Sequence, residues 1–399
     1  MIAHPAPAPE AVWNGLGDDG VWKEEPGFGV YVHIPFCVHR CHYCDFNTYE
    51  GLESLHRPYV DALVRQIEGW PGSHPAATSI FFGGGTPTLL DSRELGRVLG
   101  AIGARFGIAP GSEITVEANP ETVDRTRFTS LLEHGFNRVS IGVQSLVPHV
   151  LRGLGRTHSV RDALDAITAA HGAGFTNINA DLIYGSPWES PEDWRVTLEA
   201  VVAARPAHVS AYALTVEEGT PLATLVRTGR LRDVDPDVQA DRHGVAESVL
   251  DAGGYGRYEI SNWAMPGRAS RHNVLYWCAG DYLGFGAGAH AHVDGHRWWN
   301  RRLPRDFIAA ATAGELPVAG EERLDAGARA GEALMLGLRL RDGIDLAGFA
   351  HRFGASALDE RARDLDSLIS MGLLERDAGR LRLTVRGTLV ANDALCRLL

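Results

Sequence analysis

The first half of the chain alternates short apolar runs with stretches of helical character. Most of the runs are rich in Val, Ile or Phe, which is typical of strands that are buried on both faces. The six runs are Gly29–Ile34, Ser79–Phe82, Glu113–Ala118, Arg138–Val143, Asn177–Ile183 and His208–Leu214. The clearest helical stretches between them are Tyr59–Trp70, Ser92–Phe106 and Asp162–His171. This alternation predicts a parallel α/β sheet with right-handed crossovers, and six units favour an open or partial (β/α)6 barrel.

The pattern divides the chain into segments of different character. We expect a Pro/Ala/Gly-rich leader over residues 1–28, the partial barrel over 29–214, and a connecting region without clean periodicity over 215–325. Residues 326–399 return to helical periodicity and then show a strand-like pair with Gly379 near its turn. Helices followed by a hairpin resemble a winged helix, so we expect a smaller, mostly α C-terminal domain.

The charge of the chain argues against nucleic-acid binding, which needs a basic face. The formal net charge is -12 at pH 7. The winged-helix-like segment is itself acidic, so we expect it to be structural or to face a protein partner. Its acidic residues include Asp345, Asp359, Glu360, Asp364 and Asp366. No apolar run reaches the roughly 18 residues of a membrane span, and five cysteines do not make a disulfide framework, so we expect a cytoplasmic protein.

Three of the cysteines are crowded together, at Cys37, Cys41 and Cys44. They follow the first predicted strand, which places them at the carboxyl edge of the sheet, where α/β folds bind ligands. Thiolates select zinc or an iron–sulfur cluster. A [4Fe-4S] cluster on three cysteines would keep one iron open for a further ligand. A zinc ion would need a fourth ligand, for which the candidates are His33, His39 and His42.

Polar side chains follow the next strands of the predicted sheet. Gly83–Pro87 (GGGTP) follows the second strand, Glu117 and Gln144 end the third and fourth, and Asp181 lies in the fifth. The glycines predict either a tight turn or the close approach of the backbone to a ligand. The polar residues could be satisfied structural hydrogen bonders. Because four successive strands place them at one edge, we expect a shared ligand site.

The CxxxCxxC spacing on the first loop of such a barrel resembles the radical S-adenosylmethionine (SAM) superfamily. Six motifs over residues 29–188 then occur in the order of the anaerobic coproporphyrinogen III oxidase family: YVHIPFCVHRCHYCDF, FFGGGTPT, EANPE, NRVSIGVQS, LGRTH and DLIYGSP. The resemblance implies a [4Fe-4S] cluster whose free iron binds SAM. The further SAM contacts that it implies are Tyr31, Tyr43, Gly84, Gly85, Thr86, Glu117, Gln144, Arg156 and Asp181. In the oxidase, a second SAM molecule is bound by the residues at the positions of Gly85, Thr86, Gln144, Arg156 and Asp181.

Two features favour a sister branch of this family, the HemW-type heme chaperones. The oxidases resemble CxxxCxxCxC, whereas this chain has Phe46 in place of the fourth cysteine. Arg271–Trp277 also contains the HNxxYW motif of the chaperone branch. Imidazole can ligate heme iron, so the resemblance makes His272 the expected ligand, although a histidine beside aromatics is often a core residue. Rival ligands are His290, His292 and His296, and Cys278 is a candidate for covalent attachment.

The resemblance therefore implies a heme chaperone that transfers heme to an acceptor protein. Its cofactors would be a [4Fe-4S] cluster, SAM and heme, and its catalytic activity stays open. The implied partners are acceptors such as membrane respiratory enzymes, together with an electron donor such as a flavodoxin or ferredoxin, with a peripheral membrane contact left open. The alternatives are an oxygen-independent coproporphyrinogen III oxidase and a zinc-stabilised interaction protein.

Overall fold

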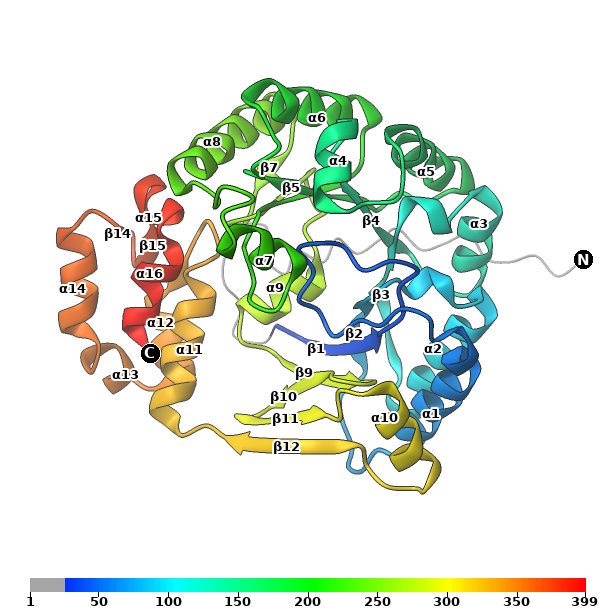
Figure 1. Cartoon of the computed structure of the whole chain (residues 1–399). Helices are drawn as coiled ribbons and strands as arrows, with labels where there is room; N and C mark the ends of the chain where they lie inside the picture. Colours follow the sequence, from blue (N-terminus) through cyan, green and yellow to red (C-terminus); the bar gives the residue numbers. More distant parts are fainter. Residues whose placement is uncertain (1–25) are drawn as a thin grey trace, which may run out of the picture.

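The computed structural model describes residues 26–399, so residues 1–25 of the predicted leader lie outside the described part of the chain. A sheet of 12 strands, in the order β12-β11-β10-β9-β1-β2-β3-β4-β5-β6-β8-β7, curves around a central space and leaves its two edges apart (Figure 1). The six strands that the sequence predicts are parallel neighbours in it. They are β1 (Phe28–Ile34), β2 (Ala77–Gly84), β3 (Ile108–Ala118), β4 (Arg138–Gln144), β5 (Ile178–Tyr184) and β6 (His208–Ala213). The predicted α/β class with an open sheet is confirmed.

Helices connect these strands, and most of them cover the outer face of the sheet (Figure 1). They are α1 (His56–Glu68), α2 (Ser92–Phe106), α3 (Arg125–Glu133), α4 (Pro148–Leu154), α5 (Val160–Ala173), α6 (Pro191–Ala204), α7 (Pro221–Arg227) and α8 (Pro236–Ala252). Side-chain caps fix where several of them begin. Ser159 and Ser190 each form a reciprocal capping box, with Asp162 and Asp193, which satisfies amide groups that the first turn leaves unpaired.

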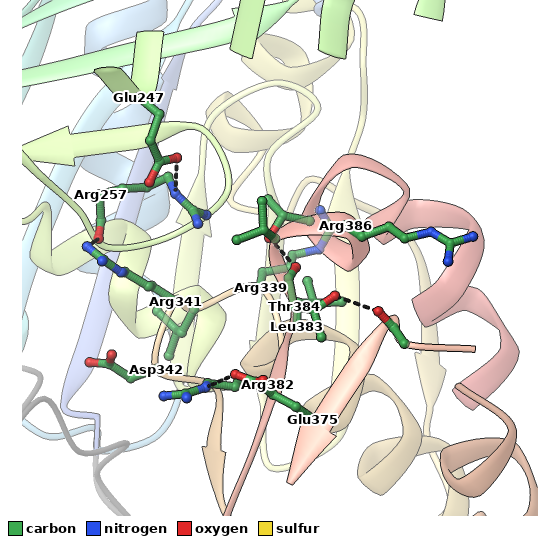
Figure 2. A pocket seen from close by; sticks show the side chains of 14 residues that line it. Glu247, Arg257, Arg339, Arg341, Asp342, Glu375, Arg382, Leu383, Thr384 and Arg386 are labelled. Atoms are coloured by element: carbon green, nitrogen blue, oxygen red, sulfur yellow. Dashed lines mark hydrogen bonds and ion pairs between the residues drawn. The ribbon is translucent and has the colours of Figure 1, made fainter. Parts of the chain in front are cut away.

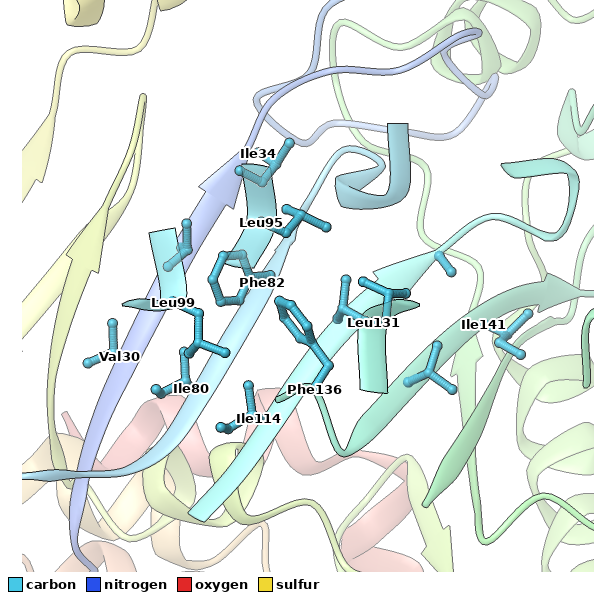
Figure 3. Close-up of a cluster of buried hydrophobic side chains, with 14 of the residues drawn as sticks. Val30, Ile34, Ile80, Phe82, Leu95, Leu99, Ile114, Leu131, Phe136 and Ile141 are labelled. Carbon is cyan, nitrogen blue, oxygen red and sulfur yellow. The ribbon is translucent and has the colours of Figure 1, made fainter. Parts of the chain in front are cut away.

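Apolar side chains fill the layer between the sheet and its helices. Val30, Ile80 and Ile114, from three neighbouring strands, lie beneath Leu95 and Leu99 of α2 (Figure 3). Because side chains alternate along a strand, the intervening residues face the inside of the ring. On β3–β6 these inner residues are polar: Glu113, Glu117, Arg138, Ser140, Asn179, Asp181, His208 and Ser210. The ring therefore has an apolar outer layer and a polar interior.

The connecting region adds strands to both edges of the same sheet. β7 (Gly256–Arg257) and β8 (Asn262–Ala264) extend the β6 edge in antiparallel order. At the other edge, β9 (Asp281–Phe285) is parallel to β1, and three antiparallel strands follow: β10 (His290–Val293), β11 (His296–Asn300) and β12 (Val318–Arg323). Besides α7 and α8, this region contains α9 (Arg271–Trp277), which lies inside the ring, and α10 (Pro304–Thr312) (Figure 1). These strands are too short to produce a recognisable alternation of apolar and polar residues in the sequence.

The C-terminal domain packs around a second apolar core, which includes Leu334, Phe349 and Leu368 and also Val274 and Cys278 of the connecting region. Its helices are α11 (Ala326–Gly337), α12 (Leu346–Phe353), α13 (Ser356–Asp359), α14 (Ala362–Ser370), α15 (Val385–Leu389) and α16 (Ala391–Leu395), and its strands are β13 (Ile344–Asp345), β14 (Leu374–Asp377) and β15 (Arg380–Leu383). The hairpin turns at Ala378 and Gly379, which both have positive φ, at 46° and 80°. Among the described residues, no helix is both long and apolar enough to cross a bilayer.

Candidate functional site

A cavity of about 370 Å³ lies at the carboxyl edge of the parallel strands, under the cysteine loop. Its wall brings together side chains that are far apart in the sequence but follow successive strands. The predicted site residues in this wall are Cys37, Cys41, Tyr43, Cys44, Gly84, Gly85, Glu117, Gln144, Arg156 and Asp181. The structure thus places the cysteines and most of the predicted SAM contacts around one space.

The cysteine loop is held in place by backbone hydrogen bonds at several points. The amide of Cys37 donates to the Tyr49 carbonyl at 3.0 Å, and the amide of Tyr49 donates to the Pro35 carbonyl at 2.8 Å. Farther along, the amide of His42 donates to the Leu154 carbonyl at 3.2 Å, which ties the loop to the end of α4. The fold therefore presets the backbone that carries the three thiols.

Each thiol has a polar neighbour. The sulfur of Cys41 lies 3.3 Å from an Arg156 guanidinium nitrogen, while Cys37 and Cys44 lie 3.8 and 3.9 Å from the hydroxyls of Thr86 and Thr48. Burial raises the pKa of Cys37 to about 11, so a metal would have to displace its proton. No group of three or more His, Cys, Asp or Glu in the described chain is arranged to hold a single metal ion. A four-iron cluster needs a different arrangement, with each thiolate on its own iron.

The histidines that could complete a zinc site have other partners. The ring of His33 is buried, with Nδ1 2.9 Å from the Tyr31 hydroxyl and Nε2 2.9 Å from the Asn47 carbonyl. His42 Nδ1 lies 3.2 Å from the Gly153 carbonyl, and His39 faces Glu50. Through these contacts, the three rings help to fix the conformation of the cysteine loop.

Two carboxyl groups line the cavity from inner positions of β3 and β5, which are separated by β4. Glu117 accepts a hydrogen bond from the Gly84 amide at 2.9 Å. Asp181 accepts from the Ser140 hydroxyl at 2.6 Å and from the Asn179 amide nitrogen at 2.8 Å. Burial, with a further contribution from the charge of Asp181, raises the pKa of Glu117 to about 8. A cationic ligand would relieve this repulsion, and the sulfonium and ammonium groups of SAM are cations.

Arg156 and Gln144 also line the cavity. The Arg156 guanidinium donates to the Asn119 side-chain oxygen at 2.7 Å and to the Gly142 carbonyl at 3.1 Å, besides its contact with Cys41. Gln144 has a φ of 63° and lies where the pairing of β4 with β5 shifts register. Such strain in a residue other than glycine is concentrated at functional sites, and here it turns the side chain into the cavity.

Two of the predicted SAM contacts, Tyr31 and Thr86, do not line the cavity. Tyr31 touches His33, and the Thr86 amide donates to the Phe36 carbonyl at 2.8 Å while its hydroxyl accepts from Asn119 at 2.9 Å. Sequence reasoning in turn missed wall residues such as Asn119, Ser140 and Tyr212. The signals for them were present, because Asn119 is in the EANPE motif and the other two are inner residues of predicted strands.

Phe46, in place of the fourth cysteine, lies at the mouth of the cavity and is 64% exposed. Val38, on the same loop, is equally exposed at 64%. Phe46 therefore places an apolar ring at the entrance to the cysteine cavity, which Val38 does not line.

His272 lies in α9, inside the ring, and is only 1% exposed. Its Nδ1 is 3.0 Å from the Ser79 hydroxyl, its Nε2 is 2.9 Å from the Tyr276 hydroxyl, and its ring stacks on Phe81 with centroids 5.2 Å apart. Burial lowers the pKa of His272 to about 3, so the imidazole is neutral. Both ring nitrogens have partners in this arrangement, so His272 could ligate iron only after releasing one of them.

The rival candidates differ in accessibility. His290 is exposed and stacks on Trp299, whereas His292 and His296 are partly buried and face carboxylates. Cys278 is buried in the core of the C-terminal domain. The structure does not gather these four residues and His272 into one ligand set.

Comparisons with known proteins decide the family. The Radical SAM superfamily matches residues 31–201, and the HemN C-terminal domain matches residues 324–390. The heme chaperone HemW of Mycobacterium tuberculosis is 43% identical over 378 residues, which cover 93% of this chain and 94% of that protein. The chain belongs to the HemW family. The heme chaperone HemW of Escherichia coli is 35% identical and covers 93% of this chain and 97% of its own length.

A solved structure supports the fold. The radical SAM enzyme coproporphyrinogen III oxidase (HemN) of Escherichia coli superposes with a TM-score of 0.81, covering 94% of this chain and 91% of its own chain. Its sequence identity is 22%, so the likeness concerns the fold alone. Together with the HemW relatives, it confirms the predicted radical SAM barrel with a mostly helical C-terminal domain.

Proposed function

We propose that this chain is a heme chaperone, which binds heme and passes it to an acceptor protein from a radical SAM scaffold. The observation that carries the proposal is Phe46. It stands at the mouth of an otherwise complete cysteine cavity, where the oxidases have a fourth thiol, and its ring is 64% exposed. The HemW relatives agree with this choice, since their names describe heme chaperones. The acceptor is proposed to be a membrane respiratory enzyme and the electron donor a flavodoxin or ferredoxin.

The residues around the cavity fit the two cofactors of such a scaffold. Cys37, Cys41 and Cys44 would hold the [4Fe-4S] cluster, and Glu117 and Asp181 would pair with the cationic end of SAM. When bound, the cluster supplies an electron to the SAM sulfonium. The protein's own part is to hold Cys41 beside the positive charge of Arg156, to fix the loop backbone, and to shield the site under it. The positions that serve a second SAM in the oxidase stay a prediction here.

The proposal is tested by anaerobic reconstitution with iron and sulfide, followed by titration with hemin and SAM. We expect saturable hemin binding by absorption spectroscopy and no protoporphyrinogen when coproporphyrinogen III is added under reducing conditions. Formation of protoporphyrinogen would instead establish the oxidase alternative. A wild-type chain that binds zinc in place of iron and sulfide would favour the interaction-protein alternative.

We propose His272 as the iron ligand, which requires that Tyr276 release Nε2. His272→Ala should then abolish the spectral signature of axial imidazole ligation. Tyr276→Phe is the matched variant, because it removes the competing hydrogen bond and keeps the imidazole. A neutral hydrogen bond contributes about 0.5–1.5 kcal/mol, so Tyr276→Phe should strengthen hemin binding by roughly two- to tenfold. An unchanged hemin spectrum and stoichiometry in His272→Ala would leave the ring as a packing residue on Phe81.

A further inference from the structure

A chain of hydrogen bonds runs through the polar interior of the ring, from the cysteine cavity to the start of α9. At the cavity, the Asn179 side-chain nitrogen donates to Asp181 at 2.8 Å. Asn179 Oδ1 lies 2.6 Å from Nδ1 of His208, its register partner on β6. His208 Nε2 lies 2.8 Å from the Tyr258 hydroxyl. The amide of Ser270, the residue before α9, donates to the same hydroxyl at 3.3 Å.

The two ends of this chain fix the direction of every bond in it. A carboxylate only accepts, so Asn179 turns its nitrogen to Asp181 and its oxygen to His208. A backbone amide only donates, so the Tyr258 oxygen accepts from Ser270 and its own proton points to His208 Nε2. His208 is then a donor at Nδ1 and an acceptor at Nε2, which is one tautomer of the neutral ring.

The surroundings of His208 keep its ring in this neutral form. His208, Asn179 and Tyr258 are all buried. Burial, together with the positive charge of Arg138, lowers the pKa of His208 well below its usual value. A buried polar atom that loses its partner costs free energy. The chain is therefore held in one arrangement of donors and acceptors.

His208 is the neighbour that selects the orientation of the Asn179 amide on the side away from Asp181. The Ser210 hydroxyl also contacts Asn179, but it lies 3.0 Å from the nitrogen and 3.2 Å from the oxygen. Because a hydroxyl can donate or accept, Ser210 is compatible with either orientation. The Nδ1 proton of His208 is compatible with only one, in which the Asn179 nitrogen faces Asp181.

We propose that Asn179 and His208 are positioning residues for SAM binding, which orient the Asp181 carboxylate for the cationic end of the ligand. Neither residue lines the cavity, whereas Asp181 does, so each acts through Asp181. The donors to Asp181 come from Ser140 and Asn179, on the inner face of the sheet. The inference rests on the proposed function, in which Asp181 pairs with SAM.

The test separates the hydrogen bond of His208 from the space that its ring fills. His208→Leu keeps most of the volume and loses the donor. After anaerobic reconstitution, it should weaken SAM binding on the order of tenfold in equilibrium dialysis, as expected when a hydrogen bond to a charged group is disturbed. His208→Asn leaves unfilled space but keeps a nitrogen at the position of Nδ1, so it should bind SAM within about twofold of wild type. A histidine that only fills space predicts the opposite order.

Two controls complete the design. His243→Leu makes the same substitution at another buried histidine, in α8, whose Nε2 lies 3.2 Å from the Ile260 carbonyl. It should leave SAM affinity unchanged. In an Asp181→Asn background, His208→Leu should have no further effect, because the charge that His208 helps to orient is gone.

Wild-type SAM affinity in a folded His208→Leu variant would overturn the proposal. Weaker binding by His208→Asn than by His208→Leu would overturn it too, as would an undiminished effect in the Asp181→Asn background. In these cases SAM and hemin binding by the wild type, and with them the proposed function, would still stand. A wild type that binds hemin but no SAM would overturn the SAM part of the proposed function, and this inference with it.

If His208→Leu does not fold, Tyr258→Phe carries the test, with Tyr255→Phe as its control. Each removes one buried hydroxyl, which donates to His208 in the first case and to the Pro206 carbonyl, at 2.7 Å, in the second. Loss of a neutral hydrogen bond should weaken SAM binding by roughly threefold in Tyr258→Phe. The control should bind SAM as wild type does, and equal affinity of the two variants would overturn the proposal.

Discussion

Replacing any one of Cys37, Cys41 or Cys44 with Ala should abolish cluster assembly and, with it, cleavage of SAM. Three thiolates on one loop are the least that can hold a four-iron cluster while leaving one iron open. Loss of one thiolate would expose a second iron corner to water and oxidation. After anaerobic reconstitution, iron and acid-labile sulfide should fall to background in each variant, and 5′-deoxyadenosine should be undetectable.

Cys396→Ala is the matched control for this experiment. Cys396 is exposed near the end of the C-terminal domain, and its sulfur contacts only the Asp393 carbonyl among the described residues, at 3.3 Å. The variant should assemble the cluster and cleave SAM at the wild-type level. Full iron and sulfide in Cys41→Ala would show that another residue ligates the cluster, and equal losses in Cys396→Ala would point to a general effect of removing thiols.

The barrel and its site could be predicted because their information is local in the sequence. β1–β6 begin and end within a few residues of the apolar runs, since strands that are buried on both faces must be apolar almost throughout. The polar exceptions, such as Glu117 and Asp181, follow from alternation along a strand. Parallel strands bring their carboxyl ends to one edge, so consecutive polar residues converge there without knowledge of any long-range contact.

Other features depend on contacts that no local pattern encodes. β7–β12 extend both edges of the barrel sheet, and strands of two to six residues are too short to show a period. The surroundings of His272 come from Ser79, 193 positions away in the sequence. A cavity lined by five arginines lies between α8 and α15 (Figure 2), and its residues come together only because the C-terminal domain packs against the barrel.

Gly85→Ala should both destabilise the chain and prevent cluster assembly. The amide of Gly85 donates to the Ile34 carbonyl at 2.8 Å, so the glycine run lies directly against the exit of β1. A methyl group at Gly85 would lie 2.6 Å from the Phe36 carbonyl oxygen and 2.9 Å from that of Ile34. Both are backbone atoms, which cannot rotate away as a side chain would, so β1 and the loop that begins at Cys37 would have to move.

Overpacking of this kind costs about 1–3 kcal/mol, which denaturant unfolding of the apo-protein would measure. Gly100→Ala is the control, because Gly100 lies within α2 with no atom inside 4 Å of the added methyl group. There, alanine should raise the free energy of unfolding by about 0.5–1 kcal/mol, since it restricts the unfolded chain and favours the helix. If Gly85→Ala kept full iron content and an unchanged midpoint, the glycine run would be a simple turn. If Gly85→Ala kept its stability but lost iron, the close approach of the two backbones would be required for cluster assembly and not for folding.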